Sequence, residues 1–510
     1  MKLSRLIDLM PIVRISQSGD PEITSICYRS QDAGPGAMFV AIRGAHADGH
    51  QYVRNAIDRG AAAVVVAADH HLSASDTAVA RVEDTRKALA AVSSAFYGHP
   101  SEKLVLIGIT GTNGKTTTAY LMEHLLKAQG KKVGVIGTIN YRYQGRVFAN
   151  PLTTPESLEL QKILAEMVAA GVTHAVMEVS SHGIAQDRIY HCWFDMAIYT
   201  NLTQDHLDFH GTMADYWACK RRFFTEYLCS GPKSSHARAI INTDNARGRE
   251  LFDDLSVSRK IAVGSHDTCD VFPLHVRLDQ HGICGDLMMA DETTPFKSSL
   301  IGHYNLENIL CAAGAGLGLG ISGTEIAGAM ASFGSVPGRL EPVVSATGRH
   351  VFVDYAHTPD ALENVLSTLK KVIPGRLICV FGCGGDRDRK KRPLMGEIAA
   401  RWSDLAVITS DNPRTEEPAA IINEIRPGVE GVVSRRYGAS DFEVGFSEKG
   451  YVVEPDRATA IHAAIRMSKP GDTILIAGKG HEDYQILGTT KIHFDDREKA
   501  AAALAGILRN

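Results

Sequence analysis

A glycine-rich segment, TGTNGKTT at residues 110–117, follows an apolar run, LVLIGI at 104–109, and precedes a stretch with helical character. A strand, a glycine turn and a helix in this order form a phosphate cradle, because the turn exposes backbone N–H groups and the helix N-terminus favours negative charge. Lys115 would reach the terminal phosphates and Thr116 would bind Mg²⁺. The strict pattern G-x-x-x-x-G-K-[ST] is not met, since Gly108 stands one residue too early. The alternative is a helix-opening glycine turn with a surface lysine.

Strand-like apolar runs alternate with helix-like stretches through most of the chain, which is typical of βαβ units and parallel sheets. With 510 residues and roughly 150 residues per domain, the chain has room for about three to four domains. Turn-forming residues at 98–100 (GHP) and 334–338 (GSVPG) mark two boundaries. The sequence therefore predicts an α/β protein divided into residues 1–98, 99–334 and 335–510.

Composition and charge exclude several classes of protein. Hydrophobic residues make up 44% of the chain and charged residues 22%, as in folded globular proteins. The 54 basic and 58 acidic residues give a net charge of −4, without the basic excess of a nucleic-acid-binding protein. The nine cysteines include no Cys-x-x-Cys pair, which argues against a disulfide framework or a structural zinc site. We therefore expect reduced thiols and no nucleic-acid partner.

The first residues of the chain do not resemble a secretion signal. Arg5, Asp8 and Arg14 interrupt the apolar core that such a signal needs. The longest uninterrupted apolar run, residues 61–68, is far shorter than the about 20 residues that span a bilayer. We therefore expect a cytoplasmic protein without membrane insertion.

Candidate metal ligands follow two further strand-like runs. Glu178 ends the run 175–178, and His206 follows the run 196–200. Because the carboxyl ends of parallel strands meet at one edge of a sheet, we expect both side chains beside the phosphate loop. Taken singly, Glu178 could be a plain edge acid and His206 an ordinary surface residue. Lys220, in DYWACKRRFF, reads from its residue type alone as part of a solvated basic face.

Four strand-like runs in the last third of the chain each end in a polar loop: VFVDYAHTPD, LICVFGCGGDRD, LAVITSDNPR and TILIAGKGHED. Ligands of open α/β sheets bind at the carboxyl ends of the strands, so we expect the four loops to converge. Arg387 and Arg414 lie in two of them, and guanidinium groups bind carboxylates bidentately, which predicts a second substrate with a carboxylate. The Asn-Lys-x-Asp loop of a switch GTPase is absent from the sequence. We interpret the charged run 386–392 as a substrate loop, the alternative being a nucleic-acid patch.

Eight segments, in order, resemble the Mur ligase family of ATP-dependent, amide-forming enzymes of peptidoglycan synthesis. They are TGTNGKTT at 110–117, MEVSSHG at 177–183, NLTQDHLDFHG at 201–211, the segment around Lys220, DYAHTPDALEN at 354–364, FGCGGDRDRKKRPLMG at 381–396, DNPRTEEP at 411–418 and AGKGHEDYQ at 477–485. The resemblance implies a UDP-binding domain over residues 1–98, a central P-loop ATPase domain over 99–334 and a Rossmann-like, amino-acid-binding domain over 335–510.

The resemblance also implies ATP as co-substrate, Mg²⁺ as cofactor and a carbamylated Lys220, whose carbamate would act as a carboxylate-like metal ligand. The implied catalytic residues are Lys115, Glu178, His206 and Lys220, and the implied metal ligands are Thr116, Glu178, His206 and carbamylated Lys220. The implied ATP-binding residues are Gly111, Thr112, Asn113, Gly114, Lys115, Thr116, Thr117, Asn305, Arg339, Asp354 and His357.

Two organic substrates are implied as well. UDP-N-acetylmuramoyl-L-alanyl-D-glutamate would contact Tyr28, Ser30, Ala45, His46, Ala47, Thr153, Thr154, Ser180, Gln186 and Arg188. Meso-diaminopimelate would contact Arg387, Asp411, Asn412, Pro413, Arg414, Gly478 and Glu482. Arg414 favours diaminopimelate over lysine, because a guanidinium group there would bind the second carboxylate of diaminopimelate. The chain departs from the family pattern at Arg29-Ser30-Gln31, where Asp-Ser-Arg is usual, and at Leu152, where Asn is common.

The activity implied by the resemblance is ATP-dependent addition of diaminopimelate to the γ-carboxylate of the D-glutamate through an acyl phosphate. This step belongs to peptidoglycan synthesis, and thereby to cell-wall growth, cell shape and cell division. We expect a monomer. Three alternatives stay open: a lysine-adding member of the family, a folylpolyglutamate synthetase, and a non-catalytic protein that binds a partner in response to a nucleotide.

Overall fold

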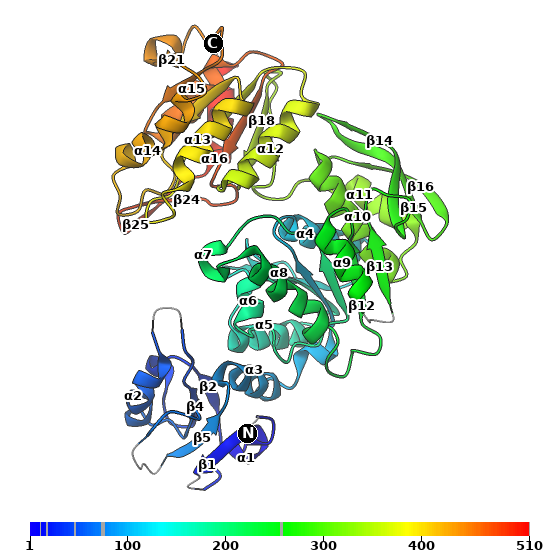
Figure 1. Ribbon diagram of the computed structural model, residues 1–510, viewed down its shortest axis with the longest axis vertical. Coiled ribbons are helices and arrows are strands. Elements are labelled where there is room, and N and C mark those ends of the chain that lie inside the picture. Colours follow the sequence, from blue (N-terminus) through cyan, green and yellow to red (C-terminus); the bar gives the residue numbers. More distant parts are fainter. Residues whose placement is uncertain (11, 17–18, 45–46, 73–76, 256–258, 509–510) are drawn as a thin grey trace. The chain divides into compact units, whose positions relative to one another are not determined.

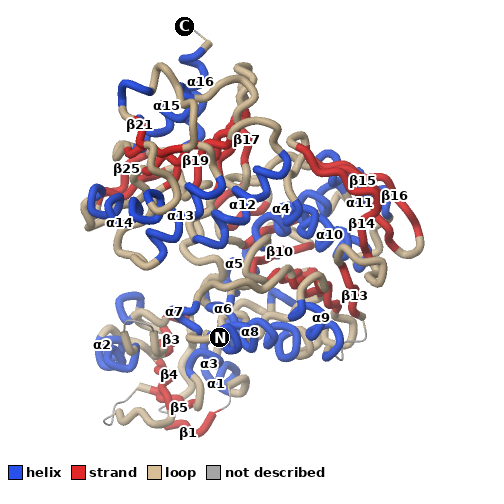
Figure 2. Tube along the Cα trace, turned by 45° about the horizontal axis from the view of Figure 1, so that its top comes forward, coloured by secondary structure: helices blue, strands red, loops and turns tan. Residues whose placement is uncertain are grey.

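The computed structural model describes the chain apart from residues 11, 17–18, 45–46, 73–76, 256–258 and 509–510. The chain forms two compact units, Met1–Pro273 with Leu287–Thr294 and Glu307–Ala329, and Leu274–Asp286 with Pro295–Leu306 and Met330–Asn510. Helices and strands alternate along both units (Figure 2), which confirms the α/β class. All nine cysteines are free thiols. Among the described residues, no helix has the length and apolar character that crossing a membrane requires.

A five-stranded sheet in the first unit has the strand order β1-β5-β4-β3-β2 (Figure 1). Its strands are β1 (Ile12–Ser16), β2 (Ser25–Cys27), β3 (Ala37–Val40), β4 (Ala63–Ala67) and β5 (Ala78–Val82), and its helices are α1 (Leu3–Ile7), α2 (Val53–Asp58) and α3 (Thr85–Phe96). Strands β2 to β5 are parallel, and β1 is antiparallel to β5. Buried side chains of α1 and α3 pack on one face of the sheet and those of α2 on the other.

A second sheet carries the glycine-rich segment. Its order is β16 (Glu292–Ser298), β15 (Gly282–Met289), β14 (Val271–Asp279), β13 (Lys260–Val263), β12 (Arg238–Asn242), β11 (Met196–Tyr199), β6 (Val105–Thr110), β10 (His174–Glu178), β7 (Val133–Ile136), β8 (Tyr141–Tyr143) and β9 (Arg146–Phe148). Strands β11, β6 and β10 are parallel neighbours. Their carboxyl ends therefore lie at one edge, which brings together the three segments that follow them.

In the described part of the chain, eight α-helices lie between these strands or directly after the last of them along the chain. They are α4 (Lys115–Ala128), α5 (Ser157–Ala169), α6 (Ser181–Ala185), α7 (Leu207–His210), α8 (Met213–Arg222), α9 (Ala246–Asp254), α10 (His303–Gly318) and α11 (Gly323–Ser332). Helix α8 continues into a π-helical turn, Phe223–Tyr227. Ser180 caps α6 by accepting a hydrogen bond from the backbone N–H of Gly183, which starts that helix directly after β10.

A seven-stranded sheet forms the core of the second unit. Its order is β17 (Glu341–Val343), β18 (His350–Asp354), β23 (Thr473–Ala477), β19 (Leu377–Phe381), β20 (Leu405–Ile408), β22 (Gly450–Val453) and β21 (Arg436–Tyr437), next to a hairpin of β24 (Tyr484–Leu487) and β25 (Thr490–His493). All but β17 are parallel. Its helices are α12 (Pro359–Val372), α13 (Lys391–Trp402), α14 (Pro418–Glu430), α15 (Arg457–Met467) and α16 (Asp496–Ile507). The first three pack on one face and the last two on the other, as expected of the Rossmann-like domain that the resemblance implies.

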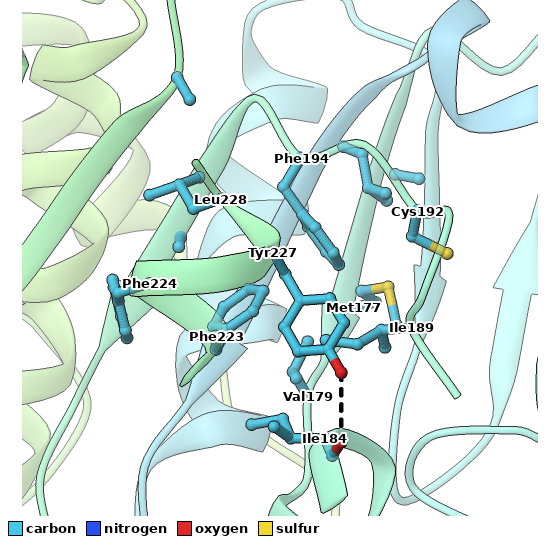
Figure 3. Close-up of a cluster of buried hydrophobic side chains, with 14 of the residues drawn as sticks. Met177, Val179, Ile184, Ile189, Cys192, Phe194, Phe223, Phe224, Tyr227 and Leu228 are labelled. Carbon is cyan, nitrogen blue, oxygen red and sulfur yellow. Dashed lines mark hydrogen bonds between the residues drawn. The ribbon is translucent and has the colours of Figure 1, made fainter. Parts of the chain in front are cut away.

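Gly108, the glycine that breaks the strict phosphate-loop pattern, is a packing residue of β6. A Cβ atom there would lie 2.5 Å from Phe223 Cζ and 2.8 Å from Phe194 Cε1, whose rings meet edge to face in the core shown in Figure 3. We expect Gly108→Ala to lower the free energy of unfolding by about 1–3 kcal/mol, because the added methyl group overpacks this core. Urea denaturation would measure it. Gly34→Ala is the matched control, since a Cβ atom at Gly34 has open space; equal stabilities of the two variants would contradict the expectation.

Candidate active site

The glycine-rich segment forms a closed loop between β6 and α4. Gly111 has φ +151° and Gly114 has φ +87°, and a Cβ atom at either position would collide with a neighbouring side chain. The backbone N–H groups of Thr112 and Asn113 donate to the backbone and side-chain oxygens of Asn201, both over 2.9 Å. Lys115 Nζ donates to Gly111 O (3.0 Å) and to Thr112 O (2.8 Å). The lysine ammonium therefore already faces the loop in which a phosphate would lie.

Glu178 lies beside this loop as a buried carboxylate. Thr116 Oγ1 donates to Glu178 Oε2 (3.0 Å). Thr138 donates to Glu178 Oε1 from its N–H (2.9 Å) and to Glu178 Oε2 from its hydroxyl (2.9 Å). None of the ion pairs formed within the described part of the chain includes Glu178. A buried carboxylate is normally paired with a cationic side chain or bound to a metal ion, whereas the donors to Glu178 are two hydroxyl groups and one backbone N–H. The surroundings of Glu178 therefore suit a divalent cation.

Lys220 is buried in the same place, and the expectation of a solvated face is wrong for this residue. Its side chain is 1% exposed, its Nζ donates to Gly111 O (2.8 Å), and it lies 4.6 Å from the centre of the Tyr216 ring. Burial, and then the charge of Lys115, lower the pKa of Lys220 well below its ordinary value. A lysine with a lowered pKa is more often the neutral amine, which is the form that adds CO₂.

His206 completes this group from the loop after β11. It has φ +53°, its N–H donates to Asp205 Oδ1 (2.8 Å), and its ring meets that of His182 at 4.9 Å. Burial lowers the pKa of His206, so that the ring is neutral and able to bind a metal ion. Within the described residues, no group of three or more His, Cys, Asp and Glu side chains is arranged to hold a metal ion.

The residues expected to hold the muramoyl dipeptide form one hydrogen-bonded group next to Glu178. Thr154 Oγ1 donates to Glu178 O and accepts from Ser180 N, both over 2.9 Å, and Thr153 Oγ1 lies 3.1 Å from Thr138 Oγ1. The guanidinium of Arg188 donates to Thr154 O (2.9 Å) and to Gln186 Oε1 (2.6 Å). The structure therefore brings Thr153, Thr154, Ser180, Gln186 and Arg188 together.

The residues expected to hold the uridine diphosphate lie in the part of the first unit that contains the five-stranded sheet. Tyr28, after β2, reaches helix α5, where its hydroxyl donates to Glu159 Oε1 (3.0 Å). Ser30 starts the short 3₁₀ helix Ser30–Asp32, and Ala47 O accepts a hydrogen bond from Gly44 N (2.9 Å). Ala45 and His46 lie outside the described residues.

Two residues that the sequence did not single out organise this region. Glu156 Oε2 lies 3.1 Å from Arg86 Nη1 of α3 and 3.6 Å from Arg188 Nε, so it joins the five-stranded sheet's helix to the dipeptide group. Tyr227, in the π-helical turn, donates to Asp187 Oδ1 (2.5 Å) and to Ile184 O (3.4 Å; Figure 3). Glu156 follows the threonine pair by two residues, which is the one signal that could have identified it.

In the second unit, the four loops predicted to converge follow four neighbouring strands, β18, β23, β19 and β20. Asn412 Nδ2 donates to Glu482 Oε2 (2.9 Å), and its Oδ1 accepts from Lys479 Nζ (3.2 Å) and Ile486 N (3.0 Å). Lys479, a fully buried residue that the sequence did not single out, thereby fixes the orientation of the Asn412 amide. Gly478 has φ +117°, and a Cβ atom there would lie 2.5 Å from Asp411 Oδ2.

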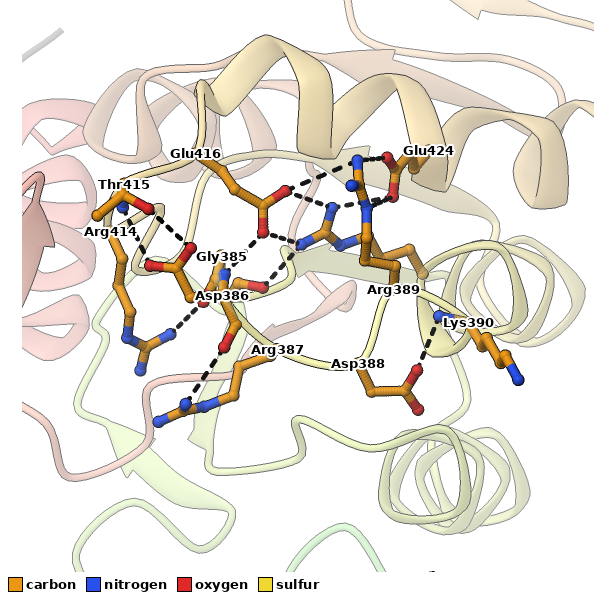
Figure 4. Close-up of polar contacts among 12 residues, drawn as sticks. Gly385, Asp386, Arg387, Asp388, Arg389, Lys390, Arg414, Thr415, Glu416 and Glu424 are labelled. Atoms are coloured by element: carbon orange, nitrogen blue, oxygen red, sulfur yellow. Dashed lines mark hydrogen bonds and ion pairs between the residues drawn. The ribbon is translucent and has the colours of Figure 1, made fainter. Parts of the chain in front are cut away.

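Arg387 and Arg414 lie on adjacent loops of this unit (Figure 4). Arg414 Nη1 donates to Gly385 O (2.7 Å), and Arg387 Nη1 donates to Asp386 O (3.3 Å). Pro413, directly before Arg414, accepts a hydrogen bond from Glu416 N (3.1 Å). Both side chains lie beside Gly384, where a Cβ atom would lie 2.9 Å from Arg414 Nη1 and 3.7 Å from Arg387 Cγ.

The four nucleotide-binding residues expected outside the glycine-rich segment also belong to the second unit. Asn305 Nδ2 donates to Ile301 O (2.8 Å), and Arg339 lies 4.8 Å from the centre of the Tyr355 ring. Asp354, at the end of β18, accepts from the N–H groups of Leu340 (2.7 Å) and Ala356 (2.8 Å), and burial raises its pKa. His357 Nδ1 lies 2.8 Å from Tyr355 O. Arg339, Asp354 and His357 thus surround one strand end.

Comparison with known proteins agrees with this geometry. Three family descriptions match the chain: the Mur ligase catalytic domain over residues 22–97, the Mur ligase middle domain over 109–316 and the Mur ligase glutamate ligase domain over 338–480. A UDP-N-acetylmuramoyl-L-alanyl-D-glutamate–2,6-diaminopimelate ligase from Geobacter metallireducens is 46% identical over 502 residues, which cover 98% of each chain. A ligase of the same name from Geobacillus thermodenitrificans is 40% identical and covers 99% of each chain.

Solved structures agree as well. A structure of a UDP-N-acetylmuramoyl-L-alanyl-D-glutamate–2,6-diaminopimelate ligase matches with a TM-score of 0.69 at 29% identity and covers 96% of each chain. MurF ligase from Thermotoga maritima in complex with ADP matches in fold, with a TM-score of 0.61 at 19% identity, over 95% of this chain and 98% of that one. The chain belongs to the Mur ligase family.

Proposed function

We propose that the protein is the ATP-dependent ligase that joins meso-2,6-diaminopimelate to the γ-carboxylate of D-glutamate in UDP-N-acetylmuramoyl-L-alanyl-D-glutamate, a step of peptidoglycan synthesis. The observation that carries this proposal is the pair Arg387 and Arg414 on adjacent loops, one of them in the sequence DNPR. Diaminopimelate has a second carboxylate for such a pair, and lysine does not. The names of the relatives that are 40% and 46% identical over nearly the full chain support the same substrate.

The first half of the reaction is phosphoryl transfer from ATP to the γ-carboxylate, which gives an acyl phosphate and ADP. The backbone N–H groups of residues 114–117, at the start of α4, would donate to the phosphates, and Lys115 would neutralise charge on the transferred group. Arg188, Thr154 and Ser180 hold the dipeptide so that its carboxylate faces the loop. Mg²⁺ bound by Thr116, Glu178, His206 and carbamylated Lys220 would neutralise further phosphate charge.

The second half is attack of an amine of diaminopimelate on the acyl phosphate, with loss of phosphate. Arg387 and Arg414 bind the distal carboxylate. Glu482, held by Asn412 and Lys479, accepts hydrogen bonds from the ammonium groups of the amino acid. These residues orient the amino acid, and orientation of reactants is a large part of catalysis in a two-substrate reaction.

We also propose three domains, over residues 1–98, 99–334 and 335–510. The three matching family descriptions and the three large sheets support this division. We propose that the protein works as a monomer in the cytoplasm, where its substrates are small molecules.

The proposed function is tested by incubating the purified protein with ATP, Mg²⁺ and the UDP-muramoyl dipeptide, with either meso-diaminopimelate or L-lysine. We expect ADP and a tripeptide product, identified by its mass, only when the dipeptide and an amino acid are both present, with kcat/KM much higher for diaminopimelate than for lysine. Equal use of lysine would indicate the lysine-adding alternative, and product from a folate substrate would indicate the folylpolyglutamate synthetase. Nucleotide binding without any product would indicate the non-catalytic alternative.

Glu178→Gln tests the metal site. We expect the Mg²⁺ concentration for half-maximal activity to rise about tenfold or more, because a neutral amide replaces a charged oxygen ligand. Titration of Mg²⁺ against ADP formation, and calorimetry of MgATP binding, would measure it. Glu325→Gln is the control, since Glu325 is an exposed residue that contacts Ser322. An unchanged Mg²⁺ requirement in Glu178→Gln would contradict the assignment of Glu178.

A further inference from the structure

The loops that carry Arg387 and Arg414 are fastened to each other by side chains that the proposed mechanism does not use (Figure 4). The Asp386 carboxylate accepts from Thr415, from its hydroxyl over 2.8 Å and from its N–H over 3.2 Å. In return, Asp386 N donates to Glu416 Oε1 (2.7 Å). The two loops are therefore joined in both directions.

Arg392, at the start of α13, binds both loops at the junction that Asp386, Thr415 and Glu416 form. Its guanidinium is fully buried and donates to Glu416 Oε1 (2.8 Å) and Oε2 (2.9 Å), to Glu424 Oε2 (2.9 Å) and to Gly384 O (3.3 Å). Arg389 also pairs with Glu424. Hydrogen bonds from Arg392, the largest cause, hold the pKa of Glu416 at about 2, so Glu416 is charged at every physiological pH.

The junction bears directly on Arg414. Both Asp386 and Arg414 have φ +53°, a conformation that is unfavourable for most L-residues and persists where the surroundings fix it. Arg414 N donates to Ile486 O (3.1 Å), and its guanidinium donates to Gly385 O (2.7 Å), one residue before Asp386. A shift of the Asp386 loop would therefore move the hydrogen-bond acceptor that aims the Arg414 guanidinium.

From these contacts we infer that Glu416, clamped by Arg392, is a positioning residue that sets the selectivity for an amino acid with a distal carboxylate. It holds the two loops so that Arg387 and Arg414 present their guanidinium groups together. The inference rests on the proposed function and deepens it. An amino acid without a distal carboxylate, such as lysine, does not use this arrangement, so the clamp affects one substrate and leaves the other nearly unaffected.

Glu416→Gln is the test, because glutamine keeps the length and an acceptor for Asp386 N but loses the charge that binds Arg392. We expect KM for diaminopimelate to rise about tenfold and kcat to change less than about threefold. With lysine, kcat/KM changes less than about twofold, so the ratio of the two specificities falls about tenfold. Thr415→Val, which removes the hydroxyl that binds Asp386, changes KM in the same direction by about threefold, and Thr415→Ser restores it.

Two outcomes would overturn the inference. One is a diaminopimelate KM that is unchanged in Glu416→Gln. The other is an equal loss with diaminopimelate and lysine, which would indicate a general structural role. Arg414→Ala serves as the reference: if it weakens diaminopimelate use and Glu416→Gln does not, the positioning role alone fails. If neither variant weakens diaminopimelate use, the proposed function fails as well.

Discussion

Replacing Lys220 by alanine is expected to lower kcat by about 10³-fold, since one preorganised charged group at a phosphoryl-transfer site is worth about 10²–10³. Lys220 is buried against Gly111 of the phosphate loop, where a bare ammonium would repel a metal ion and a carbamate would bind it. ADP formation with both organic substrates present measures the loss. Thermal unfolding of the same sample shows whether the variant is folded.

Lys220→Arg separates the two chemical roles that a buried lysine can have. Arginine keeps the positive charge but cannot become a carbamate, so we expect it to be as inactive as alanine. In wild-type protein supplied with ¹³C-bicarbonate, we expect a carbamate carbon signal that both variants lack. Arg221→Ala is the matched control, since Arg221 is the neighbour of Lys220 in the chain and forms an exposed ion pair with Asp254. Activity retained in Lys220→Arg would show that the charge itself, and no carbamate, is needed.

The place of the glycine-rich segment, Glu178 and the loop of His206 was predictable from the sequence. Each follows an apolar run that ends sharply in a polar loop, and parallel strands place such ends at one edge. The strands concerned, β11, β6 and β10, are indeed neighbours. For the same reason the four loops of the second unit were expected together, although the chain order gave no sign that β23 lies between β18 and β19.

The burial of Lys220 was not predictable, because it depends on packing between segments. A run of three basic residues on a helix is normally solvated, and nothing local distinguishes Lys220 from Arg221. In the structure, α8 packs against α6 and continues into the π-helical turn, and this places Lys220 over Gly111. Such long-range contacts leave no periodic pattern in the sequence.

The clamp around Arg392 escaped prediction for a related reason. The run 386–392 shows only a dense mixture of charges, which reads as a substrate loop or a nucleic-acid patch. Two of its arginines, Arg389 and Arg392, are paired with Glu416 and Glu424, which lie after the next strand along the chain. Arginines neutralised in this way are not available to a phosphate backbone, so the nucleic-acid alternative loses its main support.

Arg414→Ala is expected to lower kcat/KM for diaminopimelate about 100-fold, because the distal carboxylate would lose a charged, bidentate partner worth about 2–5 kcal/mol. Kinetics with lysine should change less than about threefold, since lysine offers no distal carboxylate to this guanidinium. Alanine at φ +53° is no more strained than arginine, so the change removes the side chain without a new backbone cost. Side-by-side assays with both amino acids measure the ratio.

Arg414→Lys and Arg435→Ala sharpen this comparison. Lysine keeps the charge but not the planar fork, so it should recover part of the lost affinity and remain weaker than arginine. Arg435 is an exposed residue that pairs with Glu448, and its replacement should leave both substrates unaffected. If Arg414→Ala lowered kcat/KM equally for diaminopimelate and lysine, the guanidinium would serve the shared α-amino-acid group. Selectivity would then have to arise from Arg387 alone, and the pair would not be the basis of substrate choice.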